Sequence, residues 1–200
     1  IKEFISDRIG VFTIPGTSSS IDILLDEKTE VNDLRPYIDT IRRVKSASEI
    51  QYMQEAASIA SSAHEKAMRN SRPGMGEWEI QAMVEGHFMS SQSQWSFPSI
   101  VGGGDNATVL HYKDNNQVIG SGDLVLVDAG CEVSGYASDI TRTWPVNGKF
   151  SQPQREIYEL VLRAELAGIQ ACQPGMPWVS MHEAVCETIA EGLIELGVLN

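Results

Sequence analysis

The stretch VLVDAGCEVSGYASDITRT, residues 125–143, places two aspartates, Asp128 and Asp139, eleven positions apart. Apolar and β-branched residues on both sides of the central EVSG predict a β-hairpin. With the turn centred between Val133 and Ser134, paired residues have an index sum of 267, which Asp128 and Asp139 satisfy. We therefore expect the two carboxylates directly opposite each other on one face of the hairpin, with Cβ atoms about 4.5–5.5 Å apart.

Two ionised carboxylates at that distance need a shared proton or a cation. Leu126, Val127 and Ile140 imply a partly dry setting in which the repulsion grows. A shared proton would give a carboxyl dyad of the aspartic-protease or glycosidase type, whereas one or two divalent cations would give a metallohydrolase. A slipped register, in which the aspartates face different sides, is the structural alternative, because Val133-Ser134 is not a favoured two-residue turn.

Carboxylate oxygens favour Mn²⁺, Mg²⁺ or Ca²⁺, and Zn²⁺ or Co²⁺ fits if an imidazole joins them. Two carboxylates cannot complete the coordination shell of such a metal ion, so further ligands are expected elsewhere in the protein. His64 and His87 fall in predicted helices and are read as surface or core residues. His182 begins HEAVC, which lacks the second histidine of the H-E-x-x-H motif. His111 lies seventeen residues before Asp128 and leads into the same hairpin, and its role is open between structural and functional.

Composition and charge limit the function classes. Over 200 residues, 42% hydrophobic content is enough for a buried core, and the formal net charge of −12 disfavours nucleic acid and anionic membranes as partners. No apolar stretch approaches the about 20 residues of a membrane helix, and no signal pattern stands at the N-terminus, so we expect a soluble, cytoplasmic protein. Three cysteines without a C-x-x-C pattern predict reduced, buried thiols.

Two pairs of helices flank the hairpin. Ser48 is the expected N-cap of a helix that ends near residue 70, and a second helix follows with an apolar stripe expected to be buried: Trp78, Ile80, Met83, Val84 and Phe88. Helical patterns return at 152–172 and 177–197. Both pairs read helix, Pro-Gly-Met, helix, which indicates an internal duplication; the alternative is that two hairpins reuse a common break.

We expect Gly197 to be the C-cap of the last helix. If the duplication is real, the second unit lacks everything that follows its helices, so we expect the chain to stop inside its domain. Residues 1–40 hold two weakly alternating runs, GVFTI and SIDILLD, and then the linker-like KTEVNDLRPYIDT. We interpret them as the end of a preceding domain.

The run Gly102–Gly104 matches neither the G-x-G-x-x-G motif nor the P-loop, the two glycine-rich motifs that bind phosphate. It predicts a flexible loop that lets backbone approach a substrate.

Four stretches together resemble the Xaa-Pro aminopeptidase (aminopeptidase P) group of the pita-bread metallopeptidases, which are relatives of methionine aminopeptidase, prolidase and creatinase. They are LHY, the hairpin followed by QREIYELVL, FPSIVGGGDN and RPGM. The resemblance covers residues 41–200, and residues 1–40 resemble the tail of that family's creatinase-like N-terminal domain. It implies an α+β pita-bread fold with internal duplication, truncated within its second half.

The resemblance also implies a dinuclear metal site, usually Mn²⁺, with Zn²⁺ or Co²⁺ possible, and hydrolysis of the bond between an N-terminal residue and a following proline by a hydroxide bridging the metals. Asp128 would ligate one metal with both oxygens, Asp139 would bridge the two, and His111 would lie at the scissile bond as a catalytic and substrate-binding residue. The remaining ligands, one histidine and two glutamates, are expected beyond Asn200. The implied partners are a peptide with proline at its second position and further copies of the chain, as a homo-oligomer.

Three alternative functions are compatible with the same fold. Prolidase uses the same ligands but acts on free dipeptides. Creatinase uses the fold without metal, and the presence of both Asp128 and Asp139 argues against it. A non-catalytic binding or regulatory protein is the third reading, and a missing histidine and two glutamates further along the sequence would favour it.

Overall fold

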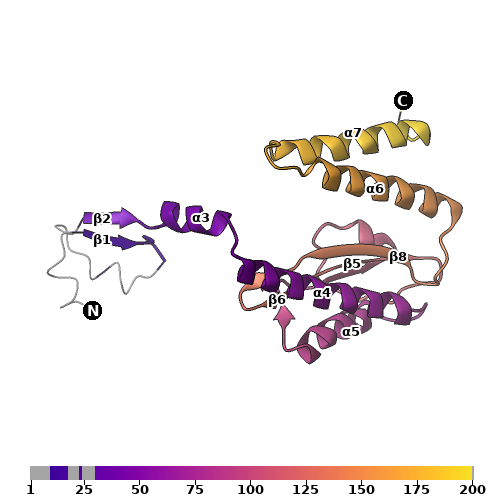
Figure 1. The fold of residues 1–200 in the computed structure, drawn as a ribbon. Coiled ribbons are helices and arrows are strands. Elements are labelled where there is room, and N and C mark those ends of the chain that lie inside the picture. Colours follow the sequence, from indigo (N-terminus) through magenta and orange to yellow (C-terminus); the bar gives the residue numbers. More distant parts are fainter. Residues whose placement is uncertain (1–9, 18–22, 24–29, 200) are drawn as a thin grey trace. The chain divides into compact units, whose positions relative to one another are not determined.

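The computed structural model describes residues 10–17, 23 and 30–199. It divides into two compact units, Ile1–Glu55 and Ala56–Asn200, which are described separately. The elements in chain order are β1 (Gly10–Thr13), β2 (Glu30–Asp33), α3 (Arg35–Arg43), α4 (Ala47–Asn70), α5 (Glu77–Ser90), β3 (Gln94–Trp95), β4 (Ile100–Gly103), η1 (Gly104–Thr108), β5 (Leu124–Ala129), β6 (Cys131–Val133), β7 (Tyr136–Ala137), β8 (Ile140–Pro145), α6 (Gln152–Ala171) and α7 (Val179–Glu195) (Figure 1).

In the first unit, β1 confirms the strand expected at GVFTI, and it pairs in parallel with β2. The linker predicted at residues 28–40 is wrong, since β2 and α3 occupy most of it. The carboxylate of Asp33 accepts hydrogen bonds from the backbone and guanidinium of Arg35, and Pro36 lies in the first turn, where its fixed φ suits a helix start. Of the predicted run SIDILLD, all but Ile23 lies outside the described residues.

The second unit is built on an antiparallel sheet in the order β4-β5-β8, with β6 and β7 extending the hairpin. The inward positions of β5, Val125, Val127 and Ala129, are buried. They pack in one apolar cluster with α4 and α5, whose buried members include Ala60, Ala67, Ile80, Val84 and Phe88. Figure 1 shows both helices on the same side of this sheet. The opposite face of β5 carries the partly buried Leu124, Leu126 and Asp128.

The hairpin is confirmed, but its predicted register is wrong. Asp128 pairs with Thr141, so the index sum is 269 rather than 267. The turn is Ser134-Gly135, and both residues have positive φ, 52° and 85°, as a type I′ turn requires. Because the shift equals two residues of one strand, the side-chain parity is preserved. Asp139 is therefore a diagonal neighbour of Asp128 on the same face instead of its direct partner.

Gly130, between β5 and β6, permits the tightest backbone approach in the hairpin. A Cβ at this position would lie 1.8 Å from the carbonyl oxygen of Ser138. We expect Gly130→Ala to destabilise the full-length protein by about 3 kcal/mol or more, because the clash is with backbone that cannot move aside. The measurement is urea-induced unfolding. Gly86→Ala is the control: the exposed Gly86 lies in α5 with nothing within 4 Å of its would-be Cβ, and this change should stabilise by about 0.5–1 kcal/mol. Equal stability of the two variants would contradict this account.

The helices are confirmed with local corrections. Ser46, not Ser48, caps α4: its hydroxyl accepts from the Glu49 amide, and the Glu49 carboxylate accepts from the Ser46 amide. In the stripe of α5, Ile80, Val84 and Phe88 are fully buried, whereas Trp78 is 47% exposed. Of the three cysteines, all free, Cys131 is buried as expected and Cys172 and Cys186 are exposed, which corrects that prediction.

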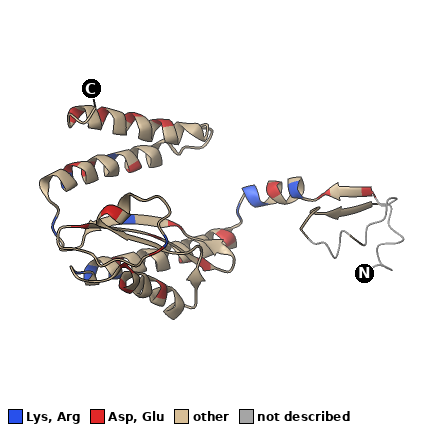
Figure 2. Ribbon diagram, turned by 180° about the vertical axis from the view of Figure 1, so that it is seen from behind, with Lys and Arg blue, Asp and Glu red and all other residues tan. Residues whose placement is uncertain are grey.

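The second helix pair forms a hairpin of its own. Ser151 caps α6 in a capping box with Gln154. Gly192 of α7 packs against Leu160 of α6 so closely that a Cβ would lie 2.1 Å from its Cδ1. Gly197, with φ of 69°, ends the helix as predicted. Figure 2 shows acidic residues along both helices, in keeping with the net charge of −12. Within the described part of the chain, no helix is long and apolar enough to span a membrane.

The glycine run is not the flexible loop that the sequence predicts. Gly102 and Gly103 end β4, and Gly104 begins η1. A Cβ on Gly102 would lie 2.8 Å from the backbone of Asn106, and one on Gly103 would lie 2.7 Å from the side chain of Ile119. The glycines therefore let the following segment fold back onto β4.

Candidate active site

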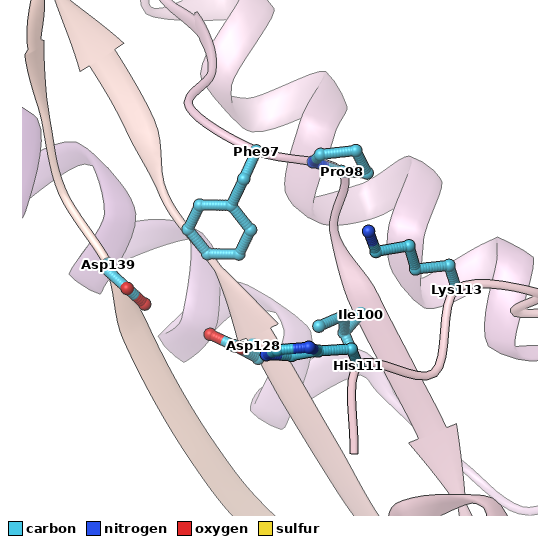
Figure 3. A pocket seen from close by; sticks show the side chains of 7 residues that line it. All are labelled: Phe97, Pro98, Ile100, His111, Lys113, Asp128 and Asp139. Atoms are coloured by element: carbon cyan, nitrogen blue, oxygen red, sulfur yellow. The ribbon is translucent and has the colours of Figure 1, made fainter. Parts of the chain in front are cut away.

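A pocket of about 260 Å³ lies on the polar side of the hairpin (Figure 3). All three site residues predicted from the sequence, His111, Asp128 and Asp139, line it. The remainder of its lining consists of Phe97, Pro98, Ile100 and Lys113. The pocket therefore combines an apolar wall with two carboxylates, an imidazole and one ammonium group.

Each predicted residue reaches the pocket from a different segment. Asp128 belongs to the central strand β5 and pairs with Ile100 of β4 on one side and Thr141 of β8 on the other. Asp139 lies just before β8, where the hairpin leaves regular pairing. His111 follows η1 and has a positive φ of 56°. A non-glycine residue in this conformation is strained, and such residues concentrate at functional sites.

The two carboxyl groups point toward each other (Figure 3). Partial burial and the neighbouring charge of Asp128 raise the pKa of Asp139 above its ordinary value. Oδ1 of Asp128 is buried and has no hydrogen-bond partner among the described residues. A buried carboxylate oxygen without a partner is costly, and a bound cation would satisfy it. The pair thus fits a divalent metal, although the described residues contain no group of three or more His, Cys, Asp or Glu that could hold one.

The other histidines lie away from this pocket, as the sequence suggests. The buried His64 ring bonds the carbonyl of Ala60, and His182 contacts the thiol of Cys186 on α7. Phe97, Pro98 and Ile100 belong to a stretch that carries the family resemblance, but the sequence does not indicate them as site residues, because apolar residues before a strand are typical of a core. Glu77 was also missed: a glutamate in the first turn of a helix ordinarily indicates only a favourable dipole contact.

The model of metallopeptidase family M24 matches residues 51–198. The chain belongs to metallopeptidase family M24. Relatives of this M24 chain include the Xaa-Pro aminopeptidase of Haemophilus influenzae, 41% identical over all of this chain and 47% of the relative, and that of Escherichia coli, 42% identical over 84% of this chain and 38% of the relative.

The solved structures agree with this M24 assignment. Aminopeptidase PepP of Pseudomonas aeruginosa matches the whole chain with a TM-score of 0.95 and 38% identity. A zinc-substituted E. coli aminopeptidase P in complex with product also matches the whole chain, with a TM-score of 0.94 and 34% identity. These matches confirm the predicted α+β pita-bread fold and the resemblance inferred from the hairpin. The M24 chain spans about half the length of these proteins, 49% in both structures.

Proposed function

We propose that this M24 chain is part of an Xaa-Pro aminopeptidase, which hydrolyses the bond between an N-terminal residue and a following proline with the help of two divalent metal ions. The observation that carries the proposal is the pocket in which Asp128 lies beside Asp139 and His111, with a buried Asp128 oxygen that no described residue hydrogen-bonds. Residues 41–200 would belong to the catalytic domain, and residues 1–40 would be the tail of a creatinase-like N-terminal domain.

In this proposal Asp128 and Asp139 hold the cations, which cancels the repulsion between their charges. Bound divalent cations supply a water nucleophile at neutral pH and polarise the carbonyl under attack. His111 hydrogen-bonds the substrate at the scissile bond, at its carbonyl oxygen or its amide nitrogen. The apolar wall of Phe97, Pro98 and Ile100 offers a surface for a proline ring and excludes water from it.

Further parts of the proposal rest on the family resemblance. Mn²⁺ is the proposed metal, with the remaining ligands, one histidine and two glutamates, supplied by sequence beyond residue 200. A homo-oligomer in the cytoplasm is the proposed assembly and location. The net charge of −12 supports the absence of nucleic acid among the partners.

The test is turnover of short peptides by the full-length, Mn²⁺-loaded protein. We expect release of the N-terminal residue from a tripeptide Xaa-Pro-Xaa, no cleavage of the dipeptide Xaa-Pro, and at least about 100-fold lower kcat/KM when alanine replaces proline, since a matched pocket discriminates by several kcal/mol. Liquid chromatography of the products measures all three. Cleavage of the dipeptide alone would identify a prolidase, and cleavage of neither peptide would favour a non-catalytic binding protein.

A further inference from the structure

Glu77, at the start of α5, is a fully buried carboxylate that does not line the pocket. Both of its oxygens accept hydrogen bonds. Oε1 accepts from the amide of Gly103 at 2.8 Å and from Nδ2 of Asn106 at 2.9 Å. Oε2 accepts from the hydroxyl of Tyr112 at 2.8 Å and from the amide of Gln117 at 3.0 Å. A buried charge with four donors is fully satisfied, so breaking this cluster is costly.

All four donors belong to residues 103–117, the segment that carries His111 and Lys113 to the pocket. Apart from η1, this segment has no helix or strand in the described structure beyond the end of β4, so regular backbone pairing does not fix it. The backbone amide of Glu77 donates in return to the carbonyl of Gln117, at 2.9 Å. Glu77 thus joins both ends and the middle of the segment to a rigid helix.

The contact nearest the pocket is through Tyr112, the residue after His111. Its hydroxyl donates to Glu77 and accepts from Nδ2 of Asn106 at 3.0 Å. Fixing the Tyr112 side chain fixes the backbone next to His111, which has the strained φ of 56°. Strain of this kind persists only where the surroundings determine the conformation. Burial alone would raise the pKa of Glu77, but the four hydrogen bonds lower it below the ordinary value, so the group is charged at neutral pH.

We infer that Glu77 is a positioning residue for His111: its buried carboxylate holds the 103–117 segment in the conformation that presents the imidazole to the pocket. The catalytic part of this inference rests on the proposed aminopeptidase function, whereas the anchoring part does not. A second anchor, Asn115, bonds the backbone of Ser99 and Val101 at β4. The segment therefore stays attached when Glu77 is changed, and loss of Glu77 loosens it around His111 without releasing it.

The test variant is Glu77→Gln in the full-length protein. Glutamine keeps the shape but has one acceptor oxygen, so its NH₂ group must face two of the four donors. Glu79→Gln is the matched control, because Glu79 lies two residues further along α5, is exposed, and its carboxylate accepts a hydrogen bond from the backbone amide of Gly76 at the start of the same helix. Tyr112→Phe removes a single donor and serves as the milder variant if Glu77→Gln does not fold.

Hydrogen exchange measured by mass spectrometry tests the anchoring without any assay of activity. We expect exchange in peptides covering residues 103–117 to rise at least about tenfold in Glu77→Gln, and less in Tyr112→Phe, because the lost hydrogen bonds protect these amides. Exchange in Glu79→Gln should match that of the unchanged protein. Unchanged exchange in folded Glu77→Gln, or in Tyr112→Phe if only that variant folds, would overturn the inference.

A double-substitution cycle tests the route through His111. With metal content and KM unchanged, Glu77→Gln should lower kcat about 10- to 100-fold, since small displacements of a catalytic group have effects of this size. In the His111→Ala background the same change should have no further effect on kcat. Equal losses in both backgrounds would indicate a merely structural role and overturn the positioning inference. An unchanged protein with no turnover would instead refute the proposed function, and the exchange result would still decide the anchoring.

Discussion

Asp139→Asn lowers kcat/KM of the full-length protein for a tripeptide Xaa-Pro-Xaa by at least about 1000-fold, because a Lewis-acidic metal contributes several kcal/mol to the transition state and each 1.36 kcal/mol is tenfold. Asparagine keeps the shape of aspartate but removes the charge that opposes Asp128 across the pocket. Bound metal, measured by mass spectrometry of the dialysed protein, falls to near zero. The thermal midpoint of the metal-free protein stays the same or rises, since a repulsive pair has been removed.

The control for this substitution is Asp105→Asn, which neutralises an exposed carboxylate on η1 outside the pocket. Metal content and kcat/KM of the control should equal those of the unchanged protein. Stoichiometric, tight Mn²⁺ binding by Asp139→Asn would contradict the assignment of Asp139 as a metal ligand.

His111→Ala has the second largest expected effect, a loss of about 100- to 10 000-fold in kcat with both metal ions retained, the range for a side chain that donates or transfers a proton at the reacting group. The reason is its position: His111 lines the same pocket as the two aspartates but reaches it from a separate segment. Steady-state kinetics together with metal analysis separate this role from metal binding.

His182→Ala, on the exposed surface of α7, is the matched control and should leave kcat unchanged. If His111→Ala lost its metal in parallel with its activity, the imidazole would have to be counted among the ligands. Full activity of His111→Ala would remove it from the site altogether.

The spacing of Asp128 and Asp139 predicts that both lie on one face of the hairpin, although the predicted register is wrong. The sequence pattern predicts a turn at Val133-Ser134, whereas the chain turns at Ser134-Gly135, where glycine accepts a positive φ without strain. The two carboxylates still share a face, because the difference in register equals two residues on one strand, which preserves the face on which Asp139 lies. An error of one residue would have separated the carboxylates.

The apolar face of a helix is readable from its period, but its burial depends on what packs there. Ile50 and Met53 of α4 fit the apolar spacing and are 45% and 41% exposed, while the small residues Ala56, Ala60 and Ala63 are fully buried where the helix lies close to the sheet. The role of Glu77 could not be predicted for a related reason. Its four donors lie 26 to 40 residues away along the chain, and no local sequence pattern indicates hydrogen bonds between residues so far apart.

The most direct test of the central claim is an anomalous difference map from crystals of the full-length protein grown with Mn²⁺. The account predicts two peaks about 3.5–4 Å apart, with oxygens of both Asp128 and Asp139 within about 2.0–2.6 Å of the metals and one Asp139 oxygen on each. A fully occupied Mn²⁺ site elsewhere in the protein, with no peak at these two carboxylates, would contradict it.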